Sequence, residues 1–206
     1  MTDIAYMRRS IDAAFRLALR DQRAWSGFDL TADGFFRSFT AILIVMPLNI
    51  LIDLFATDVA AKKKIAEGGT VAGAYEFSDA IFSTVAMGAK WLIFPVAMIF
   101  VLRFVGLTHR YSALIIAHNW ATVVIALVNI PAFALGSMGL LSPDLAFDVT
   151  FIVLGLTLYY RFYIAQTALD AGLGIAGSVT LLDFLLKVYF AIGVSATAGL
   201  WLPAAA

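Results

Sequence analysis

The sequence predicts an all-α fold, a polytopic transmembrane bundle of about five helices. Two observations on composition predict this class. Of the 206 residues, 62% are hydrophobic and 14% are charged, whereas soluble domains carry about 25% charged residues. The mean hydropathy is +0.92. A soluble fold of this length cannot bury so much apolar surface, so we expect lipid to solvate it.

A third observation is that five apolar stretches follow residues 1–30, and each has close to the ~20 residues that a membrane-spanning helix needs. They run over residues 35–56, 81–102, 112–135, 145–165 and 179–201. Lys90 lies near the middle of the second stretch, and a span that started at Trp91 would be marginal in length. We therefore expect residues 1–30 to be a helix and linker at the cytosolic face, and residues 31–206 to form the transmembrane domain.

The N-terminal residues 3–23 predict an amphipathic helix. Its apolar residues recur at helical spacing, namely Ile4, Met7, Ile11, Ala14, Phe15 and Ala18. Arg8, Arg9 and Arg16 lie between them. Two interpretations remain open: the apolar stripe lies at the membrane interface with the arginines on anionic headgroups, or the helix covers the cytosolic side of the protein itself. Thr31 is the expected N-cap of the next helix.

The basic residues in short connections predict the orientation. They precede the first span, lie between the second and third spans at Arg103 and Arg110, and end the fourth at Arg161. We therefore expect a cytoplasmic N-terminus and an external C-terminus, in a bacterial inner membrane because the connections are compact. Residues 57–80 read as a loop on the outer side, with a short surface helix within it as the alternative, and the lysines at 62–64 disagree with the rule.

Ionisable or amide side chains within the spans are the candidate intramembrane polar site. A charged group at membrane depth costs a few kcal/mol, so it usually faces the bundle interior. The candidates are Lys90, His118, Asn129, Asp183 and Lys187. Asp53, Asp148 and Asn129 are the possible partners of Lys90 by depth.

Asp183 and Lys187 are four residues apart, so they can pair along one helix face. The same ridge continues through the small residues Ala191, Ser195 and Gly199, which let another helix approach closely. We favour a packing seam with a salt bridge over a polar path. The ridge also predicts self-association or contact with other membrane proteins.

His118 shares a helix face with Thr122 and Asn129. A histidine can relay protons or bind metal, but the chain has no cysteine and no second histidine one turn away, so a metal site is disfavoured. We favour a hydrogen-bonded structural His118. Tyr159, Tyr160 and Arg161 read as an interfacial belt, with recognition of lipid headgroups as the alternative.

No catalytic signature or phosphate-binding motif occurs in the chain. Gly172, Gly174 and Gly177 have suggestive spacing, but no strand precedes them, so they read as a loop. The sequence thus predicts no catalytic residue, no metal and no cofactor. The net charge of +0 gives no indication of nucleic-acid binding, and the lipid bilayer is the predicted partner.

The layout resembles that of the Yip1-domain membrane proteins. The points of likeness are a polar N-terminal segment, the run Gly34-Phe35-Phe36-Arg37 before the first span, and Tyr159-Tyr160-Arg161 before a glycine-rich turn. The resemblance implies five spans and a role in membrane organisation or trafficking through partner contacts. It implies no functional residue.

Three functions are compatible with these features. The sequence favours a non-enzymatic scaffold or accessory subunit that organises the membrane. The second hypothesis is a small transporter or channel component, in which the intramembrane charged residues converge on one cavity. The third is a lipid-modifying enzyme, which needs a cytosolic pocket built from His109, Arg110, Arg161 and Asp170.

Overall fold

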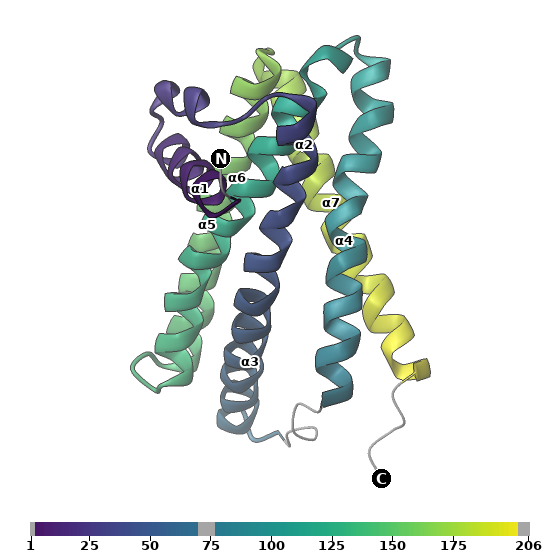
Figure 1. The fold of residues 1–206 in the computed structure, drawn as a ribbon. Coiled ribbons are helices and arrows are strands. Elements are labelled where there is room, and N and C mark those ends of the chain that lie inside the picture. The colour runs from purple at the N-terminus through teal and green to yellow at the C-terminus, as the bar shows by residue number, and fades with distance from the viewer. Residues whose placement is uncertain (1–2, 70–76, 202–206) are drawn as a thin grey trace.

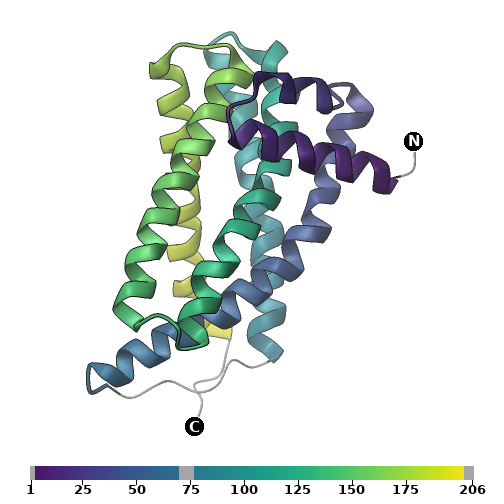
Figure 2. The ribbon, with the colours of Figure 1, turned by 90° about the vertical axis from the view of Figure 1, so that its left-hand side faces the viewer.

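The structure, a computed structural model of the chain, describes residues 3–69 and 77–201. Long helices form a bundle, and a short N-terminal helix lies across them (Figures 1 and 2). Over the described ranges the chain has helices and connections but no strand, which confirms the all-α class. The elements are α1 (Asp3–Ala18), η1 (Gln22–Gly27), α2 (Ala32–Ser38), η2 (Phe39–Ala41), α3 (Ile42–Ala66), α4 (Phe77–Phe104), η3 (Thr108–Arg110), α5 (Tyr111–Ser137), α6 (Pro143–Leu169) and α7 (Leu173–Trp201).

Four helical segments of the described chain are long and apolar enough to cross a membrane. They are Ala32–Ala66, Thr108–Ser137, Asp144–Leu169 and Leu173–Gly193. These four segments support a multi-pass membrane protein. The second predicted stretch, residues 81–102, lies within the helix α4, and several of its side chains are outside the described part of the chain.

The helix ends follow local hydrogen-bonding rules. The Thr31 hydroxyl accepts a hydrogen bond from the Gly34 backbone N–H at 3.2 Å, which confirms Thr31 as the N-cap of α2. Ser142 caps α6 in the same way through the Leu145 N–H. Helix α6 ends at Leu169, and its C-cap Asp170 has a left-handed φ of 50°, a conformation that aspartate tolerates better than most residues.

Helix α3 is longer than predicted. Residues 57–66, expected to belong to a loop, continue the helix to Ala66. Lys62 forms an ion pair with Asp58 one turn earlier at 2.7 Å, and Lys63 reaches Asp144 at the start of α6 at 3.2 Å. Val59, in the same part of α3, is buried near Gly136 of α5. These contacts stabilise the last turns of α3, and the chain leaves the helix at Gly68, whose φ is 79°.

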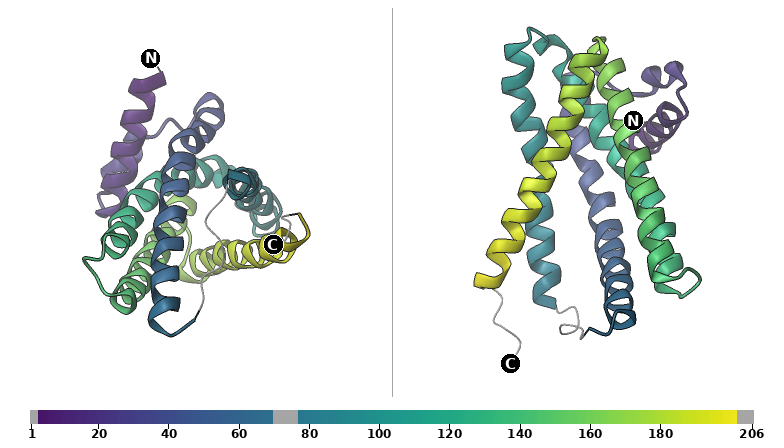
Figure 3. Two further views of the ribbon diagram at one scale, coloured as in Figure 1. Left: turned by 90° about the horizontal axis from the view of Figure 1, so that it is seen from below. Right: turned by 180° about the vertical axis from the view of Figure 1, so that it is seen from behind.

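Helix α5 is the centre of the fold. Its residues from Leu114 to Ala121 are all buried, and it contacts α1, α2, α3 and α6. Helices α4 and α7 lie on another side and diverge from α3, α5 and α6 toward the end where α7 terminates (Figures 1 and 3). The tightly packed half of the bundle is therefore the half nearer to α1.

Helix α1 covers the bundle with one face. Tyr6, Ala13, Ala14 and Leu17 are at most 2% exposed, and the Tyr160 hydroxyl donates to the Ala14 carbonyl at 2.6 Å. This face overlaps the predicted apolar stripe in part: Ala14 is buried, and Met7, Ile11 and Ala18 pack against the core. Two members of the predicted stripe, Ile4 and Phe15, are 79% and 54% exposed.

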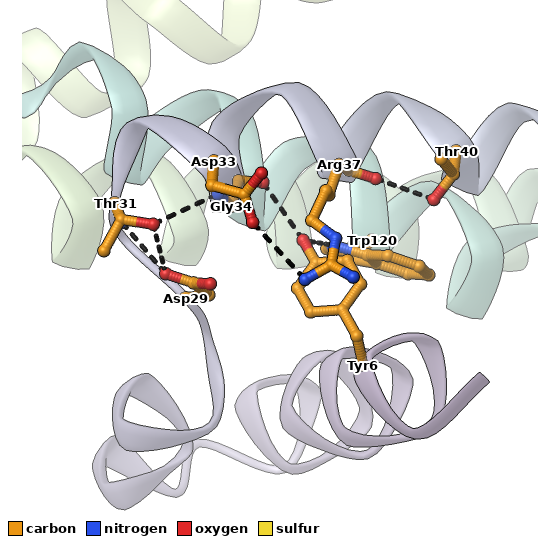
Figure 4. A network of polar contacts seen from close by, with 8 residues as sticks. All are labelled: Tyr6, Asp29, Thr31, Asp33, Gly34, Arg37, Thr40 and Trp120. Atoms are coloured by element: carbon orange, nitrogen blue, oxygen red, sulfur yellow. Dashed lines mark hydrogen bonds and ion pairs between the residues drawn. The ribbon is translucent and has the colours of Figure 1, made fainter. Parts of the chain in front are cut away.

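A buried tyrosine joins α1 to α2 and α5 (Figure 4). The Tyr6 hydroxyl donates to the Gly34 carbonyl at 3.0 Å and accepts from the Trp120 indole N–H at 3.4 Å. Its ring meets that of Trp120 edge to face, with centroids 5.6 Å apart. Both polar atoms are therefore satisfied although the rings are buried.

Gly34 also fits closely against the turn that precedes α2 (Figure 4). The side-chain and backbone donors of Thr31 bind the Asp29 carboxylate at 2.7 and 3.1 Å, and they hold the pKa of Asp29 below its ordinary value. A Cβ at Gly34 would lie 2.1 Å from the Asp29 carbonyl oxygen. Only glycine fits this position without a shift of the backbone.

We predict that Gly34→Ala destabilises the protein by about 1–3 kcal/mol, because the new methyl group overlaps rigid backbone. The measurement is thermal unfolding of the purified protein in detergent. The matched control is Gly155→Ala, since a Cβ at Gly155 on α6 meets nothing within 4 Å; it should be neutral or stabilising. Equal melting temperatures for Gly34→Ala and wild type would contradict the packing at this turn.

Candidate functional site

Asp183 of α7 lies at the centre of a group of charges in which His118 and Arg161 are also buried and Lys187 is half-buried. It is 4% exposed, and Nζ of Lys187 is 2.5 Å from its Oδ2. Arg161 Nε of α6 is 4.0 Å from the same oxygen, and His118 Nε2 of α5 is 3.9 Å from Oδ1. We call His118, Arg161, Asp183 and Lys187 the Asp183 cluster.

The cluster lies deep within the bundle. Asp183 is ten residues from the start of α7, or about 15 Å along the axis, and Arg161 is eight residues, or about 12 Å, from the end of α6. The helices that carry the cluster are three of the four candidate spans. The charges are therefore at membrane depth, where a missing partner is costly.

Arg161 links α6 to the backbone of α5. Its Nη1 donates to the His118 carbonyl at 2.9 Å, and its Nη2 donates to the Thr122 hydroxyl at 2.7 Å. Thr122 in turn donates to the His118 carbonyl at 2.9 Å. The guanidinium is thus held in one orientation, with Nε directed toward Asp183.

Helix α4 contributes an aromatic contact. The ring of Phe94 stacks on the imidazole of His118, with centroids 3.9 Å apart and planes inclined by 13°. Phe94 is 4% exposed. The cluster therefore brings together α4, α5, α6 and α7.

Two small cavities, each of about 10 Å³, flank Asp183. One is lined by His118 and Arg161, the other by Lys90 and Lys187, and both are bounded by Asp183 and Phe94. A volume near 10 Å³ is about the space that one water molecule needs. Arg161 Nε and Asp183 Oδ1 are buried with no hydrogen-bond partner among the described residues. Each could therefore form a hydrogen bond with a water molecule.

The structure unites three of the predicted polar residues, His118, Asp183 and Lys187, and places Lys90 against the same cavity as Lys187. Asn129 is not part of the group, because its side chain donates to the Ile125 carbonyl of its own helix at 2.7 Å. Lys90 interacts electrostatically with Asp53 of α3. No ion pair between them, or with Asp148, is formed within the described ranges.

Arg161 is the functional residue that the sequence misplaced. It was predicted at the interface, but α6 continues to Leu169, four residues past the predicted end, so Arg161 is two turns inside the helix. Tyr160 of α6 is also buried, and it packs against α1. Tyr159 is 45% exposed. Arg20 lies over the Tyr159 ring at 4.9 Å. The depth of Arg161 could be recognised only from the true end of α6.

The remaining interfacial candidates lie on α1. Arg8 and Arg9 are exposed, and Arg16 forms an ion pair with Asp21 at 2.6 Å. The hydrogen bond from Arg16 holds the pKa of Asp21 below its ordinary value. Arg16 thus stabilises the turn that ends α1.

The residues required for the enzyme hypothesis are not brought together. Arg110 and Asp170 form an ion pair at 3.2 Å and line a surface hollow of about 320 Å³ with Trp25. Arg161 belongs to the Asp183 cluster instead. No pocket formed by all four predicted residues is therefore present in the described structure.

The chemistry of the Asp183 cluster favours protons and hydrogen-bonding ligands over metals. One carboxylate faces an arginine, a lysine and a histidine, and the two cations repel a metal ion. Comparison of the chain with known protein families, with curated proteins and with solved structures gives no match. The function must therefore be argued from the geometry of the cluster.

We predict that Arg161→Met destabilises the protein by about 3–5 kcal/mol, the usual effect of removing one partner from a buried ion pair. Methionine keeps most of the volume but leaves Asp183 with one cation fewer. The readout is the melting temperature in detergent. Arg103→Met, at an exposed arginine near the end of α4, is the control, and a similar small effect for both variants would argue against a structural role of the cluster.

Proposed function

We propose that this chain is a small transporter or channel component in which the Asp183 cluster handles the transported species. The observation that carries the proposal is the convergence of His118, Arg161, Asp183 and Lys187 at membrane depth, with Lys90 beside the adjoining cavity. Buried ionisable residues that face one another within spans usually mark ion or proton pathways. The transporter hypothesis required the intramembrane charges to converge on one cavity. Here they converge on Asp183, which lies between two small cavities, and on this partial agreement we place transport ahead of the scaffold.

The proposal includes five spans, with α4 as the span added to the four candidate segments. An odd number of spans puts the termini on opposite sides, and the basic N-terminal region supports a cytoplasmic N-terminus in a bacterial inner membrane. The lysines at the end of α3 had disagreed with this orientation. Lys62 pairs with Asp58 and Lys63 with Asp144, but acidic residues count little in this rule, so these lysines still argue against the orientation.

We predict that Asp183→Asn lowers ion or proton flux in proteoliposomes at least about tenfold, which corresponds to ~1.4 kcal/mol in the barrier. The substitution keeps the shape of the side chain but removes the charge that Lys187 and Arg161 contact. Flux is measured with the purified protein under an imposed pH gradient and under a potassium gradient.

Asp148→Asn is the matched control, because Asp148 is exposed near the start of α6. It should leave flux unchanged. If wild type and Asp183→Asn give the same flux as empty liposomes, the transporter proposal is wrong, whereas equal flux above that background in both would remove Asp183 from the pathway.

A second candidate function, a membrane-organising scaffold or accessory subunit, is favoured by α1. This helix lies across the long helices (Figure 2), so it is oriented along the membrane plane if the long helices cross it. Its buried face is fastened to the bundle, while Ile4, Phe15 and Leu19 are exposed. An amphipathic helix so placed suits the membrane interface.

This second function is also the one that the Yip1-like layout implies. Self-association or contact with another membrane protein would use the ridge of small residues on α7. Ala191 on that ridge is exposed. The side chains of Ser195 and Gly199 lie outside the described residues.

We predict that a spin label attached to the cysteine of a Phe15→Cys variant, on α1, contacts lipid. The chain has no cysteine, so one introduced cysteine is labelled selectively. The label should collide with oxygen more often than with a water-soluble nickel reagent in proteoliposomes. Glu67→Cys, at an exposed residue beyond α3, is the aqueous control and Phe151→Cys, exposed on α6, is the lipid control; an aqueous signature at Phe15 would remove α1 from the interface.

A further inference from the structure

The Asp183 cluster contains more cations than anions. Asp183 is the carboxylate that contacts Lys187 and lies near Arg161, while Lys90 of α4 has Asp53 of α3 as its electrostatic neighbour. With neutral histidine, the pair of Lys187 and Arg161 leaves one positive charge uncompensated. Burial of a net charge in a low-dielectric region is unfavourable, so loss of one proton would neutralise the group.

The group that can lose this proton is Lys187. Arginine stays protonated in proteins, whereas lysine changes its protonation state readily when buried. Arg161 is also held by two hydrogen bonds to α5. Among the described residues Lys187 has one polar contact, with Asp183 at 2.5 Å, and it lines a cavity with space for one water molecule.

Asp183 has a second partner available within reach. Its Oδ2 is in contact with Lys187 but is 4.0 Å from Arg161 Nε, and that Nε is buried without a hydrogen-bond partner among the described residues. A small rotation of the carboxylate would close this gap. Arg161 is therefore positioned to hold Asp183 when Lys187 releases it.

We propose that Lys187 exchanges one proton with a water molecule in the cavity that it shares with Lys90 and Asp183, and that Asp183 transfers its contact from Lys187 to Arg161 when Lys187 is neutral. The species handled by the site is then a proton. This inference rests on the proposed transport function for its purpose, but the exchange itself can be measured without transport.

The step is balanced in atoms and charge. One N–H bond of the Lys187 ammonium breaks, its electron pair stays on Nζ, and the proton leaves on water. Asp183 remains a carboxylate throughout and Arg161 remains a guanidinium, so the cluster changes from a net charge of one to zero. Proton uptake by Lys187 reverses the step.

Four charged or titratable side chains, one from each of four helices, face Lys187 and affect the balance between its ammonium and amine forms. They are Lys90 of α4, His118 of α5, Arg161 of α6 and Asp183 of α7. Lys90 and Arg161 repel the ammonium form and Asp183 attracts it. A cavity of about 10 Å³ admits water but excludes a hydrated metal ion or an organic solute, which is why the proton is the species that fits.

The test is solid-state nuclear magnetic resonance of the 15N-lysine protein in liposomes at several pH values, because amine and ammonium nitrogens give separate signals. The lysines of the chain are Lys62, Lys63, Lys64, Lys90 and Lys187. Replacing the first four by arginine leaves Lys187 as the one labelled side chain and keeps a positive charge at position 90 beside the cavity. We expect its signal to convert between ammonium and amine at a pH distinct from that of the α3 lysines in wild type.

Two further variants keep the inference falsifiable. In Lys187→Arg the separate conversion should disappear, and in Lys90→Arg it should persist. The inference is overturned if Lys187 converts together with the α3 lysines, if it does not convert, or if the separate conversion belongs to Lys90.

The two proposals fail in different ways. Conversion of Lys187 without any flux in proteoliposomes would support the proton site and reject the transport function. Flux of a potassium ion without conversion of Lys187 would support transport and reject the proton site.

Discussion

The arrangement of the long helices depends on one buried carboxylate. Asp183 brings a negative charge of α7 to a position where arginine of α6 and lysine of its own helix compensate it. Separating α7 from α6 would leave Arg161 without its carboxylate and Asp183 with Lys187 alone, which is unfavourable in an apolar medium. The polar group that could serve function therefore also contributes to the contact between α6 and α7.

Helix α5 connects the Asp183 cluster to the rest of the bundle. On one side its His118 carbonyl accepts from Arg161, and the His118 ring stacks on Phe94 of α4. On another side Trp120 contacts Tyr6 of α1, and the Asn119 amide donates to the Ser38 hydroxyl of α2 at 3.0 Å. Residues that are adjacent in one helical turn thus bind four different helices, because successive side chains on a helix point in different directions.

Individual residues show how far sequence patterns reach. The N-cap at Thr31 and the Asp183–Lys187 pair were predictable, because both depend on contacts within four residues along the chain. The end of α3 was not, since its last turns are stabilised by ion pairs and by burial of Val59 against other helices. The burial of Tyr6 on α1 was missed for a related reason: its ring can be buried because Gly34 and Trp120 satisfy its hydroxyl.

The candidate site was predictable in its members more than in its geometry. An ionisable residue in an apolar stretch can be recognised from sequence, as His118, Asp183 and Lys187 were. The inclusion of Arg161 and the exclusion of Asn129 could not be, because both depend on where a helix ends or on which carbonyl a side chain reaches.

The sequence by itself determined the helical class and the apolar segments, because the 62% of hydrophobic residues and their spacing limit what the chain can bury in water. The tertiary structure decided which charges meet, which face of α1 is buried and how deep Arg161 lies. Those features depend on contacts between residues far apart in the chain, and local pattern carries no information about which distant partner a side chain will find.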